Sequence, residues 1–295
     1  MKIILIGKVN FTHRILKKIY SLNKNYLVGI VTDNNKKTNG DFVNLVPVCK
    51  KKKLPYLVSS NINSLKTYNW IKKRSPDYIF CFGYPKLIKG NLLKLYKDRI
   101  IGFHPTKLPF NRGRHPLIWS LLLDVRKSSC TFFYISKNAD EGRIIDQTDF
   151  NIDKNTNSTQ LYNKVCKIAE NKIKQVIMKI SKGIYVKNKI TLTNVWRKRS
   201  FDDGIIDWRM SVSLILSHIK ALKPPYDYAS FIYKDFLYQI HEAKKIKIDN
   251  KYYDEFGKVI KFTKKSFIVK CGDGYLEVLK TEPLIKFNNS KNIYL

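Results

Sequence analysis

Residues 1–31 have the sequence MKIILIGKVNFTHRILKKIYSLNKNYLVGIV, and this stretch decides the fold class. Two short apolar runs, Ile3 to Ile6 and Tyr26 to Val31, flank an amphipathic segment from Phe11 to Tyr20. Short β-branched runs predict buried strands, and apolar residues at helical spacing predict a helix. A strand, a helix and a second strand in this order are typical of a parallel sheet.

The same alternation continues through the first two thirds of the chain. Further strands are predicted at Tyr78 to Phe82, Ile100 to Phe103 and Thr131 to Ile135, and further helices at Leu65 to Lys73, Pro116 to Leu123 and Thr159 to Ser181. We therefore expect an α/β fold with a Rossmann-like, mostly parallel sheet and helices on both faces. In such sheets ligands bind at the carboxyl ends of the strands, near the point where the strand order reverses.

The loop after the first strand argues against two classes of nucleotide-binding protein. Gly7-Lys8-Val9-Asn10-Phe11 has one glycine and contains neither GxGxxG nor GxxxxGK[ST]. Because those patterns supply the backbone that cradles phosphates, dinucleotide-binding and P-loop functions lose their main support.

The character of the sequence changes near residue 200. A predicted helix from Val212 to Leu222 ends at Pro224-Pro225. Five short alternating strands follow it: Ala229 to Tyr233, Tyr238 to Ala243, Gly257 to Phe262, Phe267 to Cys271 and Tyr275 to Leu279. This pattern predicts a small open, OB-like β-barrel. We expect a first domain over residues 1–200 and a second over residues 201–295.

The chain is strongly basic, and its charge is uneven. A hydrophobic content of 44% excludes a disordered chain of 295 residues, and the formal net charge is +33. Residues 1–200 hold 40 Lys and Arg against 11 Asp and Glu, whereas residues 201–295 hold 16 against 12. The excess suggests a polyanionic partner such as nucleic acid, a phosphorylated small molecule or an anionic membrane surface. Codon usage in an A+T-rich genome explains Lys and Asn enrichment equally well.

Cysteine usage and hydropathy predict a metal-free protein of the cytoplasm. The five cysteines are scattered and show no CxxC or Cys/His ligand spacing, which favours a reducing compartment without structural zinc. The apolar run before Gly7 is too short for a signal peptide, and no stretch approaches the roughly 20 apolar residues of a membrane span.

Residues 102–116, GFHPTKLPFNRGRHP, form the densest loop of the chain. The loop contains two of the five histidines together with two arginines and three prolines. His104 directly follows a predicted strand, and its ordinary pKa of about 6.5 suits an acid or base near neutrality. A structural histidine bonded to a backbone carbonyl is the alternative.

Two other loops follow predicted strands. Residues 138–143, NADEGR, place Asp140 where a carboxylate can orient an imidazole and stabilise its charged form. A turn or capping aspartate is the alternative. Gly83-Tyr84-Pro85-Lys86 follows another strand and can wall a flat apolar ligand or form a plain turn.

These residues carry a family resemblance. The run Gly102 to Trp119, with HPTKLP, RGRHP and LIW, followed by ADEGRII at residues 139–145, resembles the folate-dependent formyltransferase family. Residues 199–208 and 220–226 look like that family's junction into its C-terminal domain. The resemblance implies transfer of the formyl group of 10-formyltetrahydrofolate to a primary amine. It also implies that His104 is the general acid/base and that Asp140 orients and charges it.

One position departs from the family pattern. The family has an Asn two residues before the His, and this chain has Gly102. Loss of one oxyanion donor typically lowers the rate about 10²–10³-fold. His115 is our candidate replacement donor, with Asn111 and a backbone N–H as rivals. A binding protein without turnover is the alternative.

By family analogy the folate cleft lies between the loop after Phe82 and the loop from Ile135 to Asp140. The candidate contacts are Tyr84, Leu87, Ile88, Ile135 and Asp140. The three residues of the first loop can equally belong to the core or the wall.

The acceptor amine is less specified by the residues. We favour a nucleotide-linked amino sugar of the kind that builds surface polysaccharides, because RGRHPLIW is similar to that branch of the family and because the second domain is nearly neutral. Arg112 and Arg114 would then bind the diphosphate, since guanidinium groups match phosphate oxygens; pairing with local carboxylates is the alternative. Initiator methionyl-tRNA, a catalytically impaired folate or nucleotide binder, and hydrolysis of the formyl donor remain open, as does a homodimer.

Overall fold

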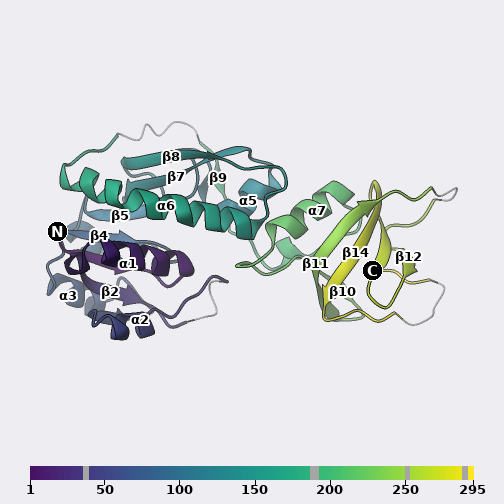
Figure 1. The fold of residues 1–295 in the computed structure, drawn as a ribbon, viewed down its shortest axis with the longest axis horizontal. Coiled ribbons are helices and arrows are strands. Elements are labelled where there is room, and N and C mark those ends of the chain that lie inside the picture. Colours follow the sequence, from purple (N-terminus) through teal and green to yellow (C-terminus); the bar gives the residue numbers. More distant parts are fainter. Residues whose placement is uncertain (36–39, 187–192, 250–252, 288–291) are drawn as a thin grey trace. The chain divides into compact units, whose positions relative to one another are not determined.

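The computed structural model describes residues 1–35, 40–186, 193–249, 253–287 and 292–295 (Figure 1). The chain divides into two compact units. The first unit holds residues 1–116, 126–152 and 162–197, and the second holds residues 117–125, 153–161 and 198–295. All the candidate site residues lie in the first unit.

Within the described residues, the main sheet of the first unit has seven strands in the order β3-β2-β1-β4-β5-β7-β8. Their bounds are β1 (Ile3–Ile6), β2 (Leu27–Thr32), β3 (Tyr56–Val58), β4 (Tyr78–Cys81), β5 (Ile100–His104), β7 (Lys127–Tyr134) and β8 (Ile144–Asn151). The first five strands run parallel, and β7 and β8 add antiparallel pairs at one edge. The predicted Rossmann-like, mostly parallel sheet is confirmed.

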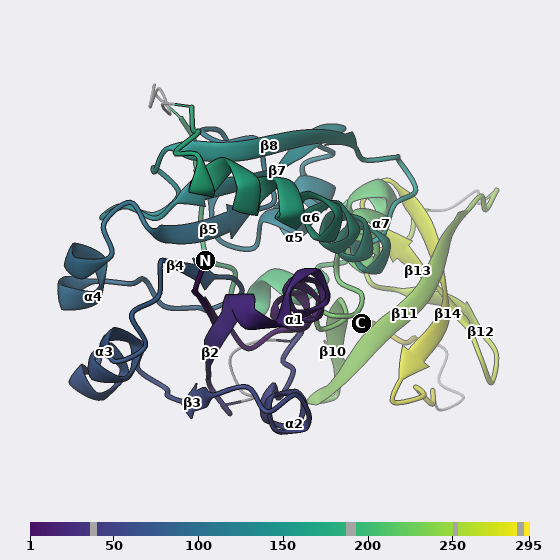
Figure 2. The same ribbon diagram turned by 60° about the vertical axis from the view of Figure 1, so that its left-hand side comes forward.

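Helices cover both faces of this sheet. They are α1 (Asn10–Leu22), α2 (Val46–Lys51), α3 (Leu65–Lys72), α4 (Gly90–Leu95) and α6 (Ser158–Ser181), with a short 3₁₀ turn at Lys24–Tyr26. Figure 2 shows α1 and α6 on one side of the strands and α3 and α4 on the other. Near the start of α6, the hydroxyl of Tyr162 accepts a hydrogen bond from the backbone N–H of Phe11 in α1, at 3.0 Å.

The strand β1 shows why the sheet is covered on both faces. All four of its residues are fully buried. Ile4 and Ile6 pack in one apolar cluster with Ile71 of α3 and Leu92 of α4. Because side chains alternate along a strand, the intervening Ile3 and Leu5 face the opposite side, where α1 lies. A strand buried on both faces is a continuous apolar run, which is the signal that made it predictable.

The crevice where the strand order reverses, between β1 and β4, is closed by the chain itself. A Cβ on Gly7 would lie 2.0 Å from the carbonyl oxygen of Phe82, and one on Gly83 would lie 2.0 Å from Cγ2 of Val9. Gly83 also has a φ of +68°. The loops after β1 and β4 are therefore in direct contact and leave no space between them. The open cleft lies beside the next strand, β5.

The second unit contains an antiparallel sheet with the strand order β10-β11-β14-β13-β12. Its elements are α5 (Pro116–Leu122), a 3₁₀ turn at Asp202–Gly204, α7 (Val212–Ala221), β10 (Ser230–Tyr233), β11 (Phe236–Ile246), β12 (Val259–Phe262), β13 (Phe267–Cys271) and β14 (Gly274–Glu282). The rings of Trp208 and Phe267 both pack edge-on against Phe231 in its core. This curled sheet confirms the predicted OB-like element (Figure 1).

None of the helices in the described part of the chain combines the length and the hydropathy that a membrane-spanning helix needs.

Candidate active site

His104 ends β5, and its ring is held from two sides. The side chain is 6% exposed, with Nδ1 lying 3.7 Å from Oδ2 of Asp140. Nε2 lies 3.0 Å from the carbonyl oxygen of Asn111. A carbonyl oxygen only accepts hydrogen bonds, so Nε2 carries a proton and donates it. In the neutral imidazole Nδ1 then holds the lone pair, and it is the atom that can accept a proton beside Asp140.

Asp140 is held by the loop that also contains Asn111, whose carbonyl contacts His104. Its Oδ2 accepts a hydrogen bond from the backbone N–H of Gly113 at 3.1 Å. Its backbone has a φ of +59°, a left-handed conformation that Asp tolerates better than most residues. The carboxylate thus faces Nδ1 of the imidazole, with 3.7 Å between the two atoms. The structure therefore brings together the two residues that the sequence proposed as a catalytic pair.

The neighbouring Glu141 anchors the same loop. Asn138 Nδ2 donates to Glu141 Oε2 at 2.7 Å, and the guanidinium of Arg112 donates to the other oxygen. These two hydrogen bonds, Asn138 first, lower the pKa of Glu141 below its ordinary value. Glu141 is therefore ionised at neutral pH and ties Arg112 to the Asp140 loop.

The two candidate phosphate ligands have different surroundings. Arg112 is mostly buried and pairs with Glu141, while its Nε has no hydrogen-bond partner among the described residues. Arg114 is exposed, and its guanidinium donates to the carbonyl oxygen of Pro85 at 3.3 Å. Arg112 thus meets the local carboxylate that the sequence left open as an alternative. The phosphate-binding role of both residues stays a prediction.

Gly102, in the place of the family Asn, is packed against aromatic and aliphatic side chains. A Cβ there would lie 2.7 Å from Cζ of Phe133 and 3.0 Å from Cγ1 of Ile135. Real Cβ atoms essentially never approach another atom to under 3.0 Å. The space beside residue 102 is therefore filled, and any side chain at this position requires Phe133 to move.

The candidate replacement donor lies further along the same loop. His115 has a φ of +54°, and Asn111 has a φ of +57°. The contacts to His104 and Asp140 described above are made by the carbonyl of Asn111 and the N–H of Gly113. The oxyanion roles of His115 and of the Asn111 side chain stay predictions.

A cleft of about 150 Å³ reaches Asp140, whereas His104 is not among the residues that line it. It is lined by Cys81, Gly83, Tyr84, Lys86, Leu87, Ile88, Gly102, Phe103, Phe133, Ile135, Ser136, Asn138, Ala139 and Asp140. All five residues predicted to contact folate are in this lining. A second cavity of about 390 Å³ shares Ile135 and Ser136 with it and is bordered by three exposed lysines, Lys94, Lys97 and Lys137. An apolar ring with an anionic tail fits such surroundings.

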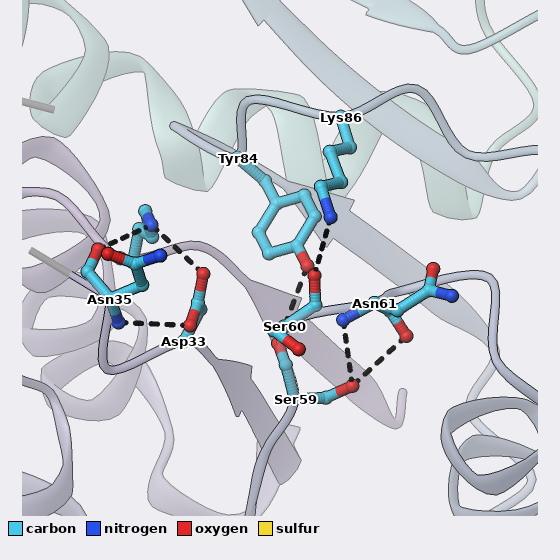
Figure 3. A network of polar contacts seen from close by, with 8 residues as sticks. Asp33, Asn35, Ser59, Ser60, Asn61, Tyr84 and Lys86 are labelled. Carbon is cyan, nitrogen blue, oxygen red and sulfur yellow. Dashed lines mark hydrogen bonds and ion pairs between the residues drawn. The ribbon is translucent and has the colours of Figure 1, made fainter. Parts of the chain in front are cut away.

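The outer wall of the cleft is held by the segment after β3. Tyr84 Oη donates to the carbonyl of Ser59 at 3.4 Å, and Lys86 Nζ donates to that of Ser60 at 2.9 Å (Figure 3). Burial raises the pKa of Tyr84 to about 12, so the phenol stays protonated and can donate. These contacts tie two residues of the cleft lining to the segment after β3.

Asn63 clamps the same wall through its side-chain amide. Its Nδ2 donates to the carbonyl of Leu87 at 2.9 Å, and its Oδ1 accepts from the N–H of Lys89 at 2.8 Å. No sequence pattern indicates this residue, because the pairing depends on the turn that brings residue 63 beside residues 87–89.

A buried ion pair occupies the carboxyl ends of β1 and β2. Lys8 is fully buried, and its Nζ lies 3.0 Å from Oδ2 of Asp33 and 2.8 Å from the carbonyl oxygen of Asn35. Figure 3 shows Asp33 and Asn35 side by side, joined by the hydrogen bond from the Asn35 N–H to Oδ1 of Asp33. In dinucleotide-binding folds, an acidic residue at the end of the second strand accepts a hydrogen bond from a ribose hydroxyl. Here that carboxylate is neutralised by Lys8.

The cysteines show no reactive thiol. All five are free, and burial raises the pKa of Cys49 to about 11 and that of Cys81 to about 12. A thiol is nucleophilic only as the thiolate, so these two are inert at neutral pH. No group of three or more His, Cys, Asp or Glu side chains suited to a metal ion occurs among the described residues.

Comparisons with known proteins connect this geometry to a chemistry. The sequence matches the formyl transferase family over residues 1–177 and the formyl transferase C-terminal domain over residues 199–288.

Two curated relatives carry different names. The bifunctional polymyxin resistance protein ArnA of Wigglesworthia glossinidia brevipalpis is 30% identical over 239 residues, which is 79% of this chain but only 35% of that protein. Methionyl-tRNA formyltransferase of Rickettsia felis is 26% identical over 287 residues, 96% of this chain and 92% of its own.

A solved structure has the same fold over nearly the whole chain. The N-formyltransferase from Helicobacter canadensis, in complex with folinic acid and dTDP-3-aminofucose, superposes with a TM-score of 0.68 and 17% identity. The match covers 95% of this chain and 99% of that one.

Proposed function

The chain belongs to the formyl transferase family, and we propose that it transfers the formyl group of 10-formyltetrahydrofolate to the primary amine of a nucleotide-linked amino sugar. The observation that carries the proposal is the His104–Asp140 pair, with 3.7 Å between Nδ1 and Oδ2. Asp140 of this pair lines the same cleft as the other candidate folate residues.

The chemistry follows from which ring nitrogen is available. The acceptor amine attacks the formyl carbon, a new C–N bond forms, and the carbonyl oxygen becomes an oxyanion. His104 Nδ1 accepts the proton that the amine loses, while Nε2–H stays bonded to Asn111. When the intermediate collapses, the bond from the formyl carbon to N10 breaks and the proton passes to N10. Asp140 stabilises the imidazolium that exists between the two transfers.

The oxyanion is the step where this chain departs from its family. Gly102 offers no side-chain donor, and Phe133 fills the adjacent space. Another donor must then polarise the formyl oxygen, and His115 or the Asn111 amide, on the loop that binds the catalytic pair, is our candidate. Removal of that donor should lower kcat about 10²–10³-fold.

Three observations favour a sugar nucleotide as acceptor. The segment beyond residue 200 carries nearly balanced charge, which argues against a role in holding a polyanionic RNA. Arg114 offers an exposed guanidinium group on the loop that carries the site, near Arg112, which is paired with Glu141. The structural neighbour described above is an N-formyltransferase that was solved in complex with dTDP-3-aminofucose. We place the catalytic domain at residues 1–200, the accessory domain at residues 201–295, and the protein in the cytoplasm.

Initiator methionyl-tRNA is the second candidate acceptor. The methionyl-tRNA formyltransferase of Rickettsia felis matches this chain over 92% of its own length. The net charge of +29 over residues 1–200, from 40 basic and 11 acidic residues, would attract a nucleic acid.

One experiment separates these acceptors. Purified protein is given 10-formyltetrahydrofolate with each of a panel of nucleotide-linked amino sugars, with charged initiator tRNA, or with no acceptor, and tetrahydrofolate release is followed. We expect acceleration by an amino sugar only, and loss of that acceleration in His104→Gln. Acceleration by tRNA only would replace the acceptor, and formate release without an amine would indicate hydrolysis. Folate binding without turnover would overturn the assignment as an enzyme.

A further inference from the structure

The segment after α6 reaches the loop that holds the catalytic pair. Val195–Trp196 form strand β9, which pairs in parallel with β6 (Arg112–Gly113). The backbone N–H of Arg114 also donates to the carbonyl of Trp196 at 3.0 Å. Residues 111–114 are therefore fixed by a chain segment more than 80 positions away.

Asn194, directly before β9, makes a reciprocal pair with Asn111. Its Oδ1 accepts from the backbone N–H of Asn111 at 3.0 Å, and its Nδ2 donates to Oδ1 of Asn111 at 2.7 Å. Two hydrogen bonds to one residue fix both its position and its orientation. Asn111 needs such support, because its φ of +57° is a conformation that a non-glycine residue adopts at a cost.

The carbonyl oxygen of Asn111 determines the state of His104. It lies 3.0 Å from His104 Nε2, and it also accepts from Thr106 Oγ1 at 3.0 Å. This carbonyl is the acceptor that requires the proton of the neutral ring to be on Nε2 and leaves Nδ1 free to act beside Asp140. A small displacement of this carbonyl oxygen would lengthen its hydrogen bond to Nε2 and weaken the preference for the Nε2–H tautomer.

We propose that Asn194 is a positioning residue for catalysis: by holding Asn111, it fixes the Nε2–H tautomer of His104 and directs Nδ1 toward Asp140. The expected change in kcat rests on the proposed function, whereas the expected change in the His104 tautomer does not. Asn194 does not contact the reacting atoms, and its effect passes through the Asn111 carbonyl.

The test uses Asn194→Ala in the full chain, with Val195→Ala as the matched control. The Val195 side chain is 60% exposed, and its backbone pairing does not depend on its side chain. We expect Asn194→Ala to lower kcat about 10–100-fold, because misplacement of a catalytic group by about 1 Å costs up to about 10²-fold. The KM for 10-formyltetrahydrofolate should change less than about twofold, and Val195→Ala should match the wild type.

A spectroscopic readout separates positioning from general destabilisation. Protein labelled with ¹⁵N at histidine gives ring nitrogen shifts that report the tautomer, and His104→Gln identifies the His104 signals among those of the five histidines. We expect the wild type to show the Nε2–H form and Asn194→Ala to show a mixture with the Nδ1–H form. An unchanged tautomer in a folded Asn194→Ala protein would overturn the proposal. This arm holds even if no acceptor is formylated.

Asn194→Asp provides the test if Asn194→Ala unfolds, and Asn111→Gly tests the coupling if Asn194→Ala folds. Asn194→Asp keeps an acceptor for the Asn111 N–H and loses the amide donor, so its kcat should fall between those of the wild type and Asn194→Ala. Asn111→Gly keeps the left-handed backbone and the carbonyl but removes the Oδ1 that Asn194 binds. In that background Asn194→Ala should cost less than in the wild type, and equal costs would contradict the coupling.

Discussion

Gly102→Ala tests whether neighbouring side chains fill the space beside residue 102, the position at which the family has an Asn. The new Cβ would lie 2.7 Å from Cζ of Phe133 and 3.0 Å from Cγ1 of Ile135, so Phe133, which is 4% exposed, must shift within the core. Overpacking of this kind costs about 1–3 kcal/mol. The lower entropy of the unfolded chain with alanine offsets about 0.4–1 kcal/mol. We expect a net loss of about 1–2 kcal/mol in the free energy of unfolding.

Thermal unfolding followed by circular dichroism measures this loss. For a unit of this size, about 1 kcal/mol lowers Tm by about 2–4 °C, so Gly102→Ala should melt about 2–8 °C below the wild type. Gly274→Ala is the control, because a Cβ there would meet Val212 Cγ2 at an ordinary 3.7 Å. It should not lower Tm.

A double mutant identifies the neighbour that is responsible. Phe133→Leu replaces the ring that meets the new Cβ with a shorter side chain, so Gly102→Ala should cost about 0.5–2 kcal/mol less in the Phe133→Leu background. A Gly102→Ala protein as stable as the wild type would refute the reasoning. So would a penalty that is the same in both backgrounds.

Three other predictions follow from contacts in the first unit. Asn63→Ala loses two hydrogen bonds to the cleft wall, each worth about 1 kcal/mol, so steady-state kinetics should show a KM for 10-formyltetrahydrofolate raised roughly 5–30-fold with a smaller change in kcat. Lys8→Met leaves Asp33 unpaired and should lower stability in urea by about 3–5 kcal/mol, a loss that Asp33→Asn in the same chain should partly reverse. Glu170 has a pKa lowered by its hydrogen bonds to Arg14, so the stability it adds is present above the ordinary Glu pKa and is lost as pH falls through the lower folded value. Glu170→Gln should therefore be less stable than the wild type by about 1 kcal/mol at pH 7 and by less at pH 3.

The fold was predictable where apolar runs were unbroken. Ile3 to Ile6 and Ile100 to Phe103 are buried on both faces and stand out from their polar flanks. Strand β8, Ile144–Asn151, leaves no such signal, because five of its eight residues are polar and it lies at the edge of the sheet. Strand β3 has only three residues, too few to show a period.

The candidate site was predictable where family motifs carried its residues. Strands β5 and β7 run antiparallel, so their carboxyl ends lie apart, and the approach of Asp140 to His104 could be inferred from the family resemblance rather than from the strand order. Asn63 and Asn194 could not, because each acts on backbone groups that only the folded chain brings near. The packing of Phe133 against Gly102 is likewise a property of side-chain placement and leaves no trace in the sequence spacing.

The most direct test of the central claim is the formylation of an acceptor amine by wild-type protein and by His104→Gln and Asp140→Asn. The product is measured as N-formylated nucleotide sugar after reaction with 10-formyltetrahydrofolate. Our account predicts that the wild type forms this product and that His104→Gln forms it about 10²–10⁴-fold more slowly while still binding folate, with Asp140→Asn also impaired. Formylation at the wild-type rate by His104→Gln would contradict it.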